Sequence, residues 1–339
     1  MKMIYVKGTG QCNLNCSHCF TSGRDGIRDR WDIEATQQWL LDYIKLKPTE
    51  DYHFELHGGE IFLRPVKELK QFCKPFVNLN NVSIAATSNL VFKLTGAHID
   101  LIRNEFEGYI GTSWDSNIRF ENDKQYNLWL KNLKTLVDEG FKVKVFVSVT
   151  RHLTESDPNK FLDTLESFGN VSVALERLTL GGNAKKNIAI FPDNETQDNW
   201  YLSVYREYKK RKMSCNIVTL DILETRLKTN TTKVDTNCRD CEQNLTTINS
   251  DGTLSGCPNT ADEFKYSSLE DGVEDYLYSE GRLDRIAKEL TPDAGCLACD
   301  VYAQCGGDCH QLGWDGNRCG GLKNTIRWIM GKTIPLKNL

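Results

Sequence analysis

The sequence predicts an α/β fold: a partial, TIM-like (β/α)6 barrel followed by a small cysteine-rich domain with a β-hairpin and helices. In the first half of the chain, six segments with the apolar pattern of strands alternate with helical segments, as in a parallel βα-repeat sheet. Six units are too few to close an eight-stranded barrel. Eight of the thirteen cysteines lie beyond residue 237. We therefore expect the barrel over residues 1–190, a bridging helical region over 191–237 and the cysteine-rich domain over 238–339.

The individual elements follow from local patterns of apolar residues. The expected strands are the apolar or alternating segments 3–6, 52–56, 82–87, 109–113, 143–149 and 171–178. The expected helices are 33–45, 66–76, 98–104, 126–137, 159–168 and, in the bridging region, 200–211. Asp32 is placed to cap the first helix. The fourth helix has apolar residues at helical spacing, and Gly140 follows where a left-handed residue commonly ends a helix.

The overall composition excludes several classes of protein. Of the 339 residues, 26% are charged and 40% hydrophobic, which is ordinary for a soluble globular protein. The formal net charge of −4 argues against nucleic acid as a partner. The chain has no N-terminal signal-peptide core and no run of eighteen apolar residues, so we expect a cytoplasmic protein without a membrane partner. Thirteen cysteines in such a protein indicate metal ligation over a disulfide framework.

The loop after the first expected strand carries three cysteines within eight residues, Cys12, Cys16 and Cys19. Soft thiolate ligands at this spacing hold iron-sulfur clusters or zinc. Three ligands leave one iron of a four-iron cluster open, whereas a structural zinc site normally has four ligands. His18 is a fourth zinc ligand on paper, but it lies directly beside Cys19. The pattern therefore favours an iron-sulfur cluster, with zinc as the alternative.

Two other motifs end expected strands. Gly58, Gly59 and Glu60 follow the second strand, and Ser113 ends the fourth. Taken alone, glycines after a strand often only form a turn, and a serine there often only caps the next turn. The carboxyl ends of parallel strands in a βα barrel form one mouth, however. We therefore expect both motifs to converge with the cysteine loop.

The C-terminal cysteines make two complete sets of four. They are Cys238, Cys241, Cys257, Cys296, Cys299, Cys305, Cys309 and Cys319. Asp251 and Gly252 predict a tight hairpin turn between strands 245–248 and 253–254. From the spacings alone, two structural zinc ions and two iron-sulfur clusters are equally good interpretations.

The spacing Cys-x3-Cys-x2-Cys resembles the signature of the radical S-adenosylmethionine (SAM) superfamily, which is built on a partial six-unit barrel. This resemblance implies that Cys12, Cys16 and Cys19 hold a 4Fe-4S cluster whose open iron chelates SAM. Reductive cleavage of SAM then yields a 5′-deoxyadenosyl radical. By the same resemblance, Gly58, Gly59 and Glu60 hold the SAM ammonium group and Ser113 contacts its carboxylate. His18 fills the place of the family's aromatic residue before the third cysteine.

The C-terminal spacings resemble the SPASM extension of radical SAM enzymes, which binds two auxiliary 4Fe-4S clusters. The resemblance implies ligand sets that interleave along the chain. Cluster I would take Cys238, Cys241, Cys257 and Cys309, and cluster II would take Cys296, Cys299, Cys305 and Cys319. The protein would thus hold three 4Fe-4S clusters and SAM. Full ligation of both auxiliary clusters suggests a role in electron transfer or in structure.

The function implied by both resemblances is oxidative modification of a ribosomally made peptide or protein, by crosslinking or oxidation at an unactivated carbon. A flavodoxin- or ferredoxin-type protein would donate electrons. Oxidation or rearrangement of a small molecule or nucleotide is the alternative, and a zinc-stabilised binding protein is the rival without catalysis. Only eleven residues precede Cys12, so we expect no leader-binding domain there. Pro258 replaces the aspartate of sulfatase-maturing members, which argues against that reaction. The sequence assigns no catalytic base.

Overall fold

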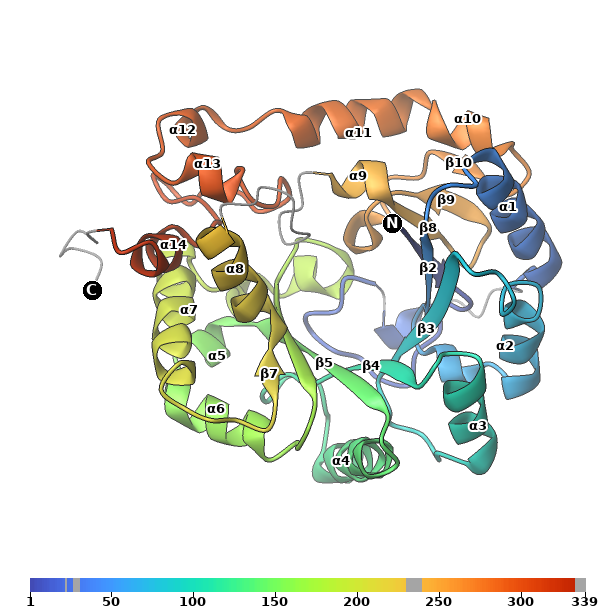
Figure 1. Cartoon of the computed structure of the whole chain (residues 1–339), viewed down its shortest axis with the longest axis horizontal. Coiled ribbons are helices and arrows are strands. Elements are labelled where there is room, and N and C mark those ends of the chain that lie inside the picture. Colours follow the sequence, from blue (N-terminus) through green and yellow to red (C-terminus); the bar gives the residue numbers. More distant parts are fainter. Residues whose placement is uncertain (22, 27–30, 230–239, 333–339) are drawn as a thin grey trace.

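The computed structural model describes residues 1–21, 23–26, 31–229 and 240–332. Its centre is a parallel sheet whose strands pair in chain order (Figure 1). These strands are β1 (Lys2–Lys7), β2 (Tyr52–His57), β3 (Val82–Ser88), β4 (Tyr109–Ser113), β5 (Lys142–Val149) and β6 (Ser172–Arg177). All six expected strands are therefore present, and the predicted partial six-unit barrel is confirmed.

Helices lie outside the curved sheet in the connections between strands (Figure 1). They are α1 (Ile33–Leu46), α2 (Val66–Cys73), α3 (Gly96–Asn104), α4 (Asp123–Asp138), α5 (Arg151–Thr154) and α6 (Pro158–Glu166). The side chain of Asp32 accepts a hydrogen bond from the Ala35 backbone N–H, as expected for the cap of α1. Gly140 follows α4 with φ +81°, a conformation that glycine adopts at little cost.

The two faces of the sheet differ in polarity. On the outer face, apolar side chains such as Val145 and Val147 of β5 are fully buried beneath the helices. Strand register places Tyr5 beside Glu55, and Lys7 beside His57, on the opposite, inner face. Because side chains alternate along a strand, this face also carries polar residues such as Ser148 and Glu176, among a few apolar ones such as Phe146. The barrel therefore combines an apolar shell with a largely polar interior, where a ligand can find hydrogen-bonding groups.

The sheet continues beyond the six expected strands. In the described part of the chain it has ten strands in the order β10-β9-β8-β1-β2-β3-β4-β5-β6-β7. The added strands are β7 (Asn216–Ile217), β8 (Leu245–Ile248), β9 (Thr253–Ser255) and β10 (Ser267–Ser268). The expected hairpin is present as antiparallel β8 and β9, with Gly252 at φ +81° in its turn. Strand β8 also pairs in parallel with β1, so the hairpin extends the barrel sheet.

The region between the barrel and the hairpin contains α7 (Asn194–Tyr208) and α8 (Val218–Thr229). Helix α7 begins earlier than expected, because Asp193 caps it by accepting from the Thr196 backbone N–H. Strand β7 of this region pairs with β6, and the expectation of a bridging helical region did not include a strand. Cys238 lies outside the described residues. The domain boundaries at residues 190 and 237 remain predictions.

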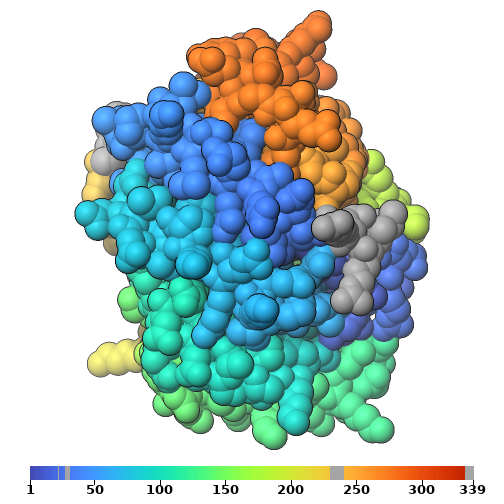
Figure 2. Space-filling view, turned by 90° about the vertical axis from the view of Figure 1, so that its right-hand side faces the viewer, coloured from blue at the N-terminus to red at the C-terminus, as the bar shows by residue number. Residues whose placement is uncertain are grey.

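Short helices complete the C-terminal part of the chain. They are α9 (Cys241–Asn244), α10 (Val273–Leu277), α11 (Glu280–Leu290), α12 (Ala294–Leu297), α13 (Tyr302–Cys305) and α14 (Lys323–Ile329). In Figure 2, C-terminal residues in orange lie directly against N-terminal residues in blue. Trp39 of α1 and Tyr276 of α10 form part of this contact, with ring centroids 5.6 Å apart. Among the described helices, none is both long and apolar enough to cross a membrane.

Candidate functional site

The cysteine loop follows β1 and is held in place by a distant segment of the chain. Within the loop, the Cys19 backbone N–H donates to the Cys16 carbonyl at 3.2 Å. The short 3-10 helix Gly182–Lys186 packs beneath it, where Ala184 N–H donates to the Cys19 carbonyl at 3.3 Å. Gly182 has φ +47°, and a Cβ atom there would lie 2.2 Å from the Thr21 carbonyl oxygen. This close contact requires glycine and fixes the loop against the barrel.

The three thiols of the loop lie near one another in a buried environment. The Cys12 sulfur receives hydrogen bonds from the Leu14 backbone N–H at 3.4 Å and from Asn89 Nδ2 at 3.6 Å. Burial raises the pKa of Cys12 to about 11 and that of Cys16 to about 12, and the neighbouring Cys19 thiol adds to both shifts. Buried, mutually repelling thiolates are stabilised when they bind metal cations. The donor chemistry therefore fits an iron-sulfur cluster.

The arrangement of the loop thiols also bears on whether the loop binds a zinc ion instead of a cluster. In the ranges that the structure describes, no three side chains of His, Cys, Asp or Glu converge on a point where one metal ion would sit. A mononuclear zinc site needs such convergence, because each sulfur lies about 2.3 Å from the metal. A four-iron cluster does not need it, since each cysteine binds a different iron. The spread of the thiols is therefore compatible with a cluster.

Gly58 and Gly59 let the end of β2 run against the segment that leads into the cysteine loop. A Cβ atom on Gly58 would lie 2.2 Å from the Thr9 carbonyl oxygen, and one on Gly59 would lie 2.2 Å from that of Gln11. Gly59 N–H donates to the Thr9 carbonyl at 2.8 Å. The motif therefore joins the cysteine loop as expected, and the glycines are required by a contact within the chain as well as by any ligand.

The Glu60 carboxylate is fully buried and already has partners. It accepts from the Phe62 backbone N–H at 3.0 Å, from Ser88 Oγ at 2.8 Å and from the Asn89 backbone N–H at 2.6 Å. Burial raises the pKa of Glu60, although these donors act in the opposite direction. Glu60 thus ties β3 to the motif. Its predicted contact with the SAM ammonium group remains a prediction.

Ser113 ends β4 half-buried, and Asp115 follows it as the centre of a buried ionic cluster. Asp115 accepts from Arg119 Nε at 2.6 Å and from the Ser148 backbone N–H at 2.5 Å. His18 Nε2 lies 3.0 Å from the same carboxylate. Arg119 holds the pKa of Asp115 well below its usual range, against the opposing effect of burial. The cluster connects the strand end to the cysteine loop through His18, whose predicted contact with the cofactor is untested.

His57 ends β2 on the inner face of the sheet, beside the cysteine loop. Its ring centroid is 5.7 Å from that of Phe20, which follows Cys19, and 6.0 Å from that of Tyr5. The Nδ1 atom is buried and has no hydrogen-bond partner among the described residues. Burial lowers the pKa of His57 to about 4, so the ring is neutral at pH 7.

We expect this neutral histidine to make the stability of the metal-free protein depend on pH. In the unfolded chain His57 takes up a proton below its ordinary pKa of about 6.5, but in the folded chain only below about 4. The free energy of unfolding should therefore fall by about 3 kcal/mol as the pH drops from about 6.5 to 4. Urea titrations at several pH values should show this fall, and His57→Phe should reduce it. An equal fall in the variant would contradict the assignment.

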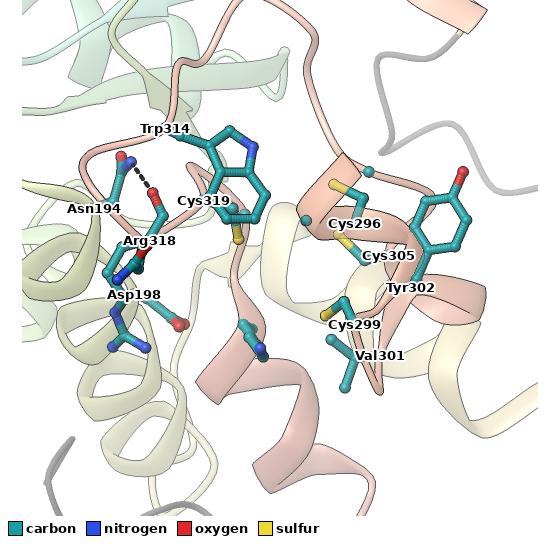
Figure 3. Close-up of a pocket in the computed structure, with 15 residues that line it drawn as sticks. Asn194, Asp198, Cys296, Cys299, Val301, Tyr302, Cys305, Trp314, Arg318 and Cys319 are labelled. Carbon is teal, nitrogen blue, oxygen red and sulfur yellow. Dashed lines mark hydrogen bonds between the residues drawn. The ribbon is translucent and has the colours of Figure 1, made fainter. Parts of the chain in front are cut away.

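A cavity of about 180 Å³ in the C-terminal region brings together four of the eight C-terminal cysteines. They are Cys296, Cys299, Cys305 and Cys319, which are the four residues predicted to bind cluster II. In Figure 3, the sulfur atoms of the first three point from one side of the cavity toward Cys319. Burial raises the pKa of Cys305 to about 12, and the Cys319 thiol contributes to this shift. Four thiols around one cavity fit a fully ligated cluster.

The described members of the predicted cluster I set also lie in one region. Burial raises the pKa of Cys257 to about 12, and nearby Cys309 adds to the rise. The buried Glu242 carboxylate accepts a hydrogen bond from the Cys257 backbone N–H. Glu289 in turn accepts from the backbone N–H groups of Cys241 at 2.7 Å and Glu242 at 3.0 Å. These carboxylates hold Cys241 and Cys257 in fixed positions relative to each other.

Comparison with known proteins gives a fold but no close relative. No protein-family model and no curated protein matches the sequence. Among solved structures, anSMEcpe with bound AdoMet and Cp18Cys peptide aligns over 97% of this chain and 95% of its own, with 13% identity and a TM-score of 0.75. Streptococcus suis SuiB bound to its precursor peptide SuiA aligns over 91% of this chain and 71% of its own, with 15% identity and a TM-score of 0.60. The protein anSMEcpe is an anaerobic sulfatase-maturating radical SAM enzyme with a SPASM domain. This chain has the fold of a SPASM radical SAM enzyme.

The SPASM radical SAM fold includes several side chains that the sequence alone did not single out. The side chains of Arg119, Asn183, Glu289 and Asp308 each contact the backbone of a cysteine or, for Arg119, the neighbouring His18. Only Arg119 had a local signal, because it follows Asp115 at the i, i+4 spacing of a helical ion pair. The others come from segments more than forty residues from the cysteine that they support or, like Asp308, depend on backbone conformation. Such contacts leave no periodic pattern of apolar residues in the sequence.

Proposed function

We propose that this protein is a radical SAM enzyme that oxidatively modifies a ribosomally made peptide or protein. The observation that carries the proposal is the position of the inner face of the sheet between two groups of cysteines. His57 reaches Phe20 beside the cysteine loop at one side. Tyr5 lies next to His57 and within electrostatic reach of Cys241 and Cys257 at the other. A substrate bound there would lie between a site of radical formation and an electron acceptor.

The residues proposed to bind the cofactor lie at or just after the carboxyl ends of the barrel strands. Cys12, Cys16 and Cys19 would bind a 4Fe-4S cluster. Backbone groups of Gly58 and Gly59, together with Glu60, Ser113 and His18, would hold SAM. When bound, this cluster supplies the electron that cleaves SAM to a 5′-deoxyadenosyl radical, which removes a hydrogen atom from the substrate. The Ser113 hydroxyl is suited to the SAM carboxylate, because Ser113 is half-buried at the end of β4 and a hydroxyl can donate a hydrogen bond to a carboxylate.

The C-terminal cysteines complete the proposed redox chain. Cys296, Cys299, Cys305 and Cys319 surround one cavity and would bind auxiliary cluster II. Cys241, Cys257 and Cys309, with Cys238, would bind auxiliary cluster I. These ligands would place an electron acceptor beside the inner face, so that removal of a hydrogen atom can end as a two-electron oxidation. A flavodoxin- or ferredoxin-type donor in the cytoplasm would reduce the first cluster.

A peptide is the preferred substrate because two solved structures of this fold are described with bound peptides. Their low identity to this chain shows only the fold, so the substrate is part of the proposal. Pro258, at the position of the aspartate in sulfatase-maturing members, argues for a different reaction. The polar inner face also suits a small molecule or nucleotide, which is the alternative substrate class.

The proposal is tested by anaerobic assay of the reconstituted enzyme with SAM, a reductant and peptides encoded beside its gene. We expect 5′-deoxyadenosine to form together with a peptide that has lost two hydrogen atoms, as detected by mass spectrometry. Deuterium at the modified carbon should appear in the deoxyadenosine. If deoxyadenosine forms only with a small molecule or nucleotide and no peptide changes mass, the alternative substrate class is correct.

A further inference from the structure

Arg177, at the end of β6, connects the barrel to the segments that carry both sets of C-terminal cysteines. Its Nη1 donates to Asp308 Oδ2 at 2.9 Å and to the Gly320 carbonyl at 2.7 Å, and its Nη2 donates to Asp308 Oδ1. Asp308 lies directly before Cys309, and Gly320 directly after Cys319. One guanidinium group therefore holds the segment of a predicted cluster I ligand and that of a predicted cluster II ligand.

Asp308 occupies an unusual backbone conformation that this contact supports. Gly306, Gly307 and Asp308 have φ values of +68°, +89° and +57°, so three successive residues lie in the left-handed region. For a residue with a Cβ atom this conformation is strained, because the Cβ atom approaches the following carbonyl oxygen. The bidentate pair with Arg177 and a hydrogen bond from Cys309 N–H to Asp308 Oδ1, at 2.7 Å, offset that strain. The turn redirects the chain from Cys305 to Cys309.

The charges of the pair lie near both groups of thiols. Cys305 and Cys309 are each within electrostatic reach of the Arg177 guanidinium, and Cys305 is also within reach of Asp308. The side chains of Arg177 and Asp308 are 14% and 10% exposed, so water screens them weakly. Arg226 is a second cation within reach of Cys305. A cation near an iron-sulfur cluster favours its reduced, more negative form, and an anion does the opposite.

We propose that Arg177 and Asp308 are positioning residues that couple the two auxiliary clusters: they fix the Cys305–Cys309 turn and set both reduction potentials through one shared ion pair. This inference rests on the proposed function, since it requires that the C-terminal cysteines hold clusters. It does not require a peptide substrate. It goes beyond the ligand assignment because it gives two non-ligand side chains a role in electron transfer.

The test compares the variants Arg177→Gln, Arg177→Lys and Asp308→Asn after anaerobic reconstitution. Redox titrations followed by electron paramagnetic resonance report both auxiliary potentials, and iron analysis reports occupancy. We expect Arg177→Gln to shift both potentials to more negative values and Asp308→Asn to shift them to more positive values. Arg177→Lys should leave both auxiliary potentials near their wild-type values, because it keeps the positive charge. Arg103→Gln, which removes an exposed arginine paired with Glu139, is the matched control and should shift neither.

Each outcome decides the inference. Opposite shifts in Arg177→Gln and Asp308→Asn support it, as does loss of auxiliary iron from Arg177→Gln when SAM cleavage persists. Full iron content with unchanged potentials in both variants would overturn it. If Arg177→Gln does not fold, Asp308→Asn alone decides by the sign of its shift. Wild-type protein without auxiliary iron would instead refute the proposed function, which separates the two failures.

Discussion

Replacing Cys16 with alanine should abolish formation of 5′-deoxyadenosine from SAM. Cys16 is a buried member of the three-cysteine loop, and the structure places the thiols of Cys12 and Cys19 close to it. With two remaining ligands, the loop cannot hold a cluster that keeps one iron open for SAM. The measurement is deoxyadenosine by liquid chromatography after reduction with SAM, together with the iron content of the same sample.

Cys215→Ala is the matched control for this prediction. Cys215 is also a buried free cysteine, but it belongs to none of the predicted ligand sets. Its replacement should cost about 1 kcal/mol of stability and leave SAM cleavage unchanged. Equal loss of cleavage in both variants would indicate a general effect on folding. Full cleavage by Cys16→Ala would remove the loop from the mechanism.

Asp115→Asn should destabilise the protein by about 3 to 5 kcal/mol, the usual cost of leaving a buried charge without its partner. Asp115 is fully buried and receives hydrogen bonds from Arg119 at 2.6 Å and Ser148 at 2.5 Å. Asparagine keeps the size of the side chain but removes the charge that compensates Arg119. Chemical denaturation of the metal-free protein measures the loss directly. We also expect weaker retention of the first cluster, since His18 loses its partner beside Cys19.

Glu121→Gln provides the comparison with an exposed ion pair in the same region. Glu121 pairs with Arg24 at 2.8 Å, but both side chains are more than 40% exposed. Its replacement should cost less than about 1 kcal/mol. If the two variants were equally stable, burial would not account for the role of Asp115. The double variant Asp115→Asn with Arg119→Met should recover part of the stability that Asp115→Asn loses, because it removes the uncompensated charge of Arg119.

Most of the barrel could be predicted because its signals are local. Each strand of the first six units and every helix except the four-residue α5 is marked by its own apolar pattern. Asp32 begins α1 by capping it, and Gly140 follows the end of α4 because glycine readily takes the left-handed conformation. The four cysteines around the C-terminal cavity could be grouped only by resemblance to a known spacing. A set of cysteines limits the metal chemistry to soft-ligand sites, but it does not say which thiols share one site.

The pairing of β8 with β1 could not be predicted, because it joins residues more than 240 positions apart through four residue pairs. Strand β7 has only two residues and carries no periodic signal at all. The ionic contacts of Asp115 with His18 and of Arg177 with Asp308 were missed for a similar reason. They depend on how the strand ends meet in space, which no sequence spacing reports.

The most direct test of the account is the metal content of wild-type protein reconstituted anaerobically with iron and sulfide, with SAM cleavage assayed on the same sample. The account predicts brown protein with about twelve irons per chain, the sum of three four-iron clusters. It also predicts 5′-deoxyadenosine after reduction with SAM. Colourless protein that retains zinc, takes up no iron and leaves SAM intact would contradict the account and favour a zinc-stabilised binding protein.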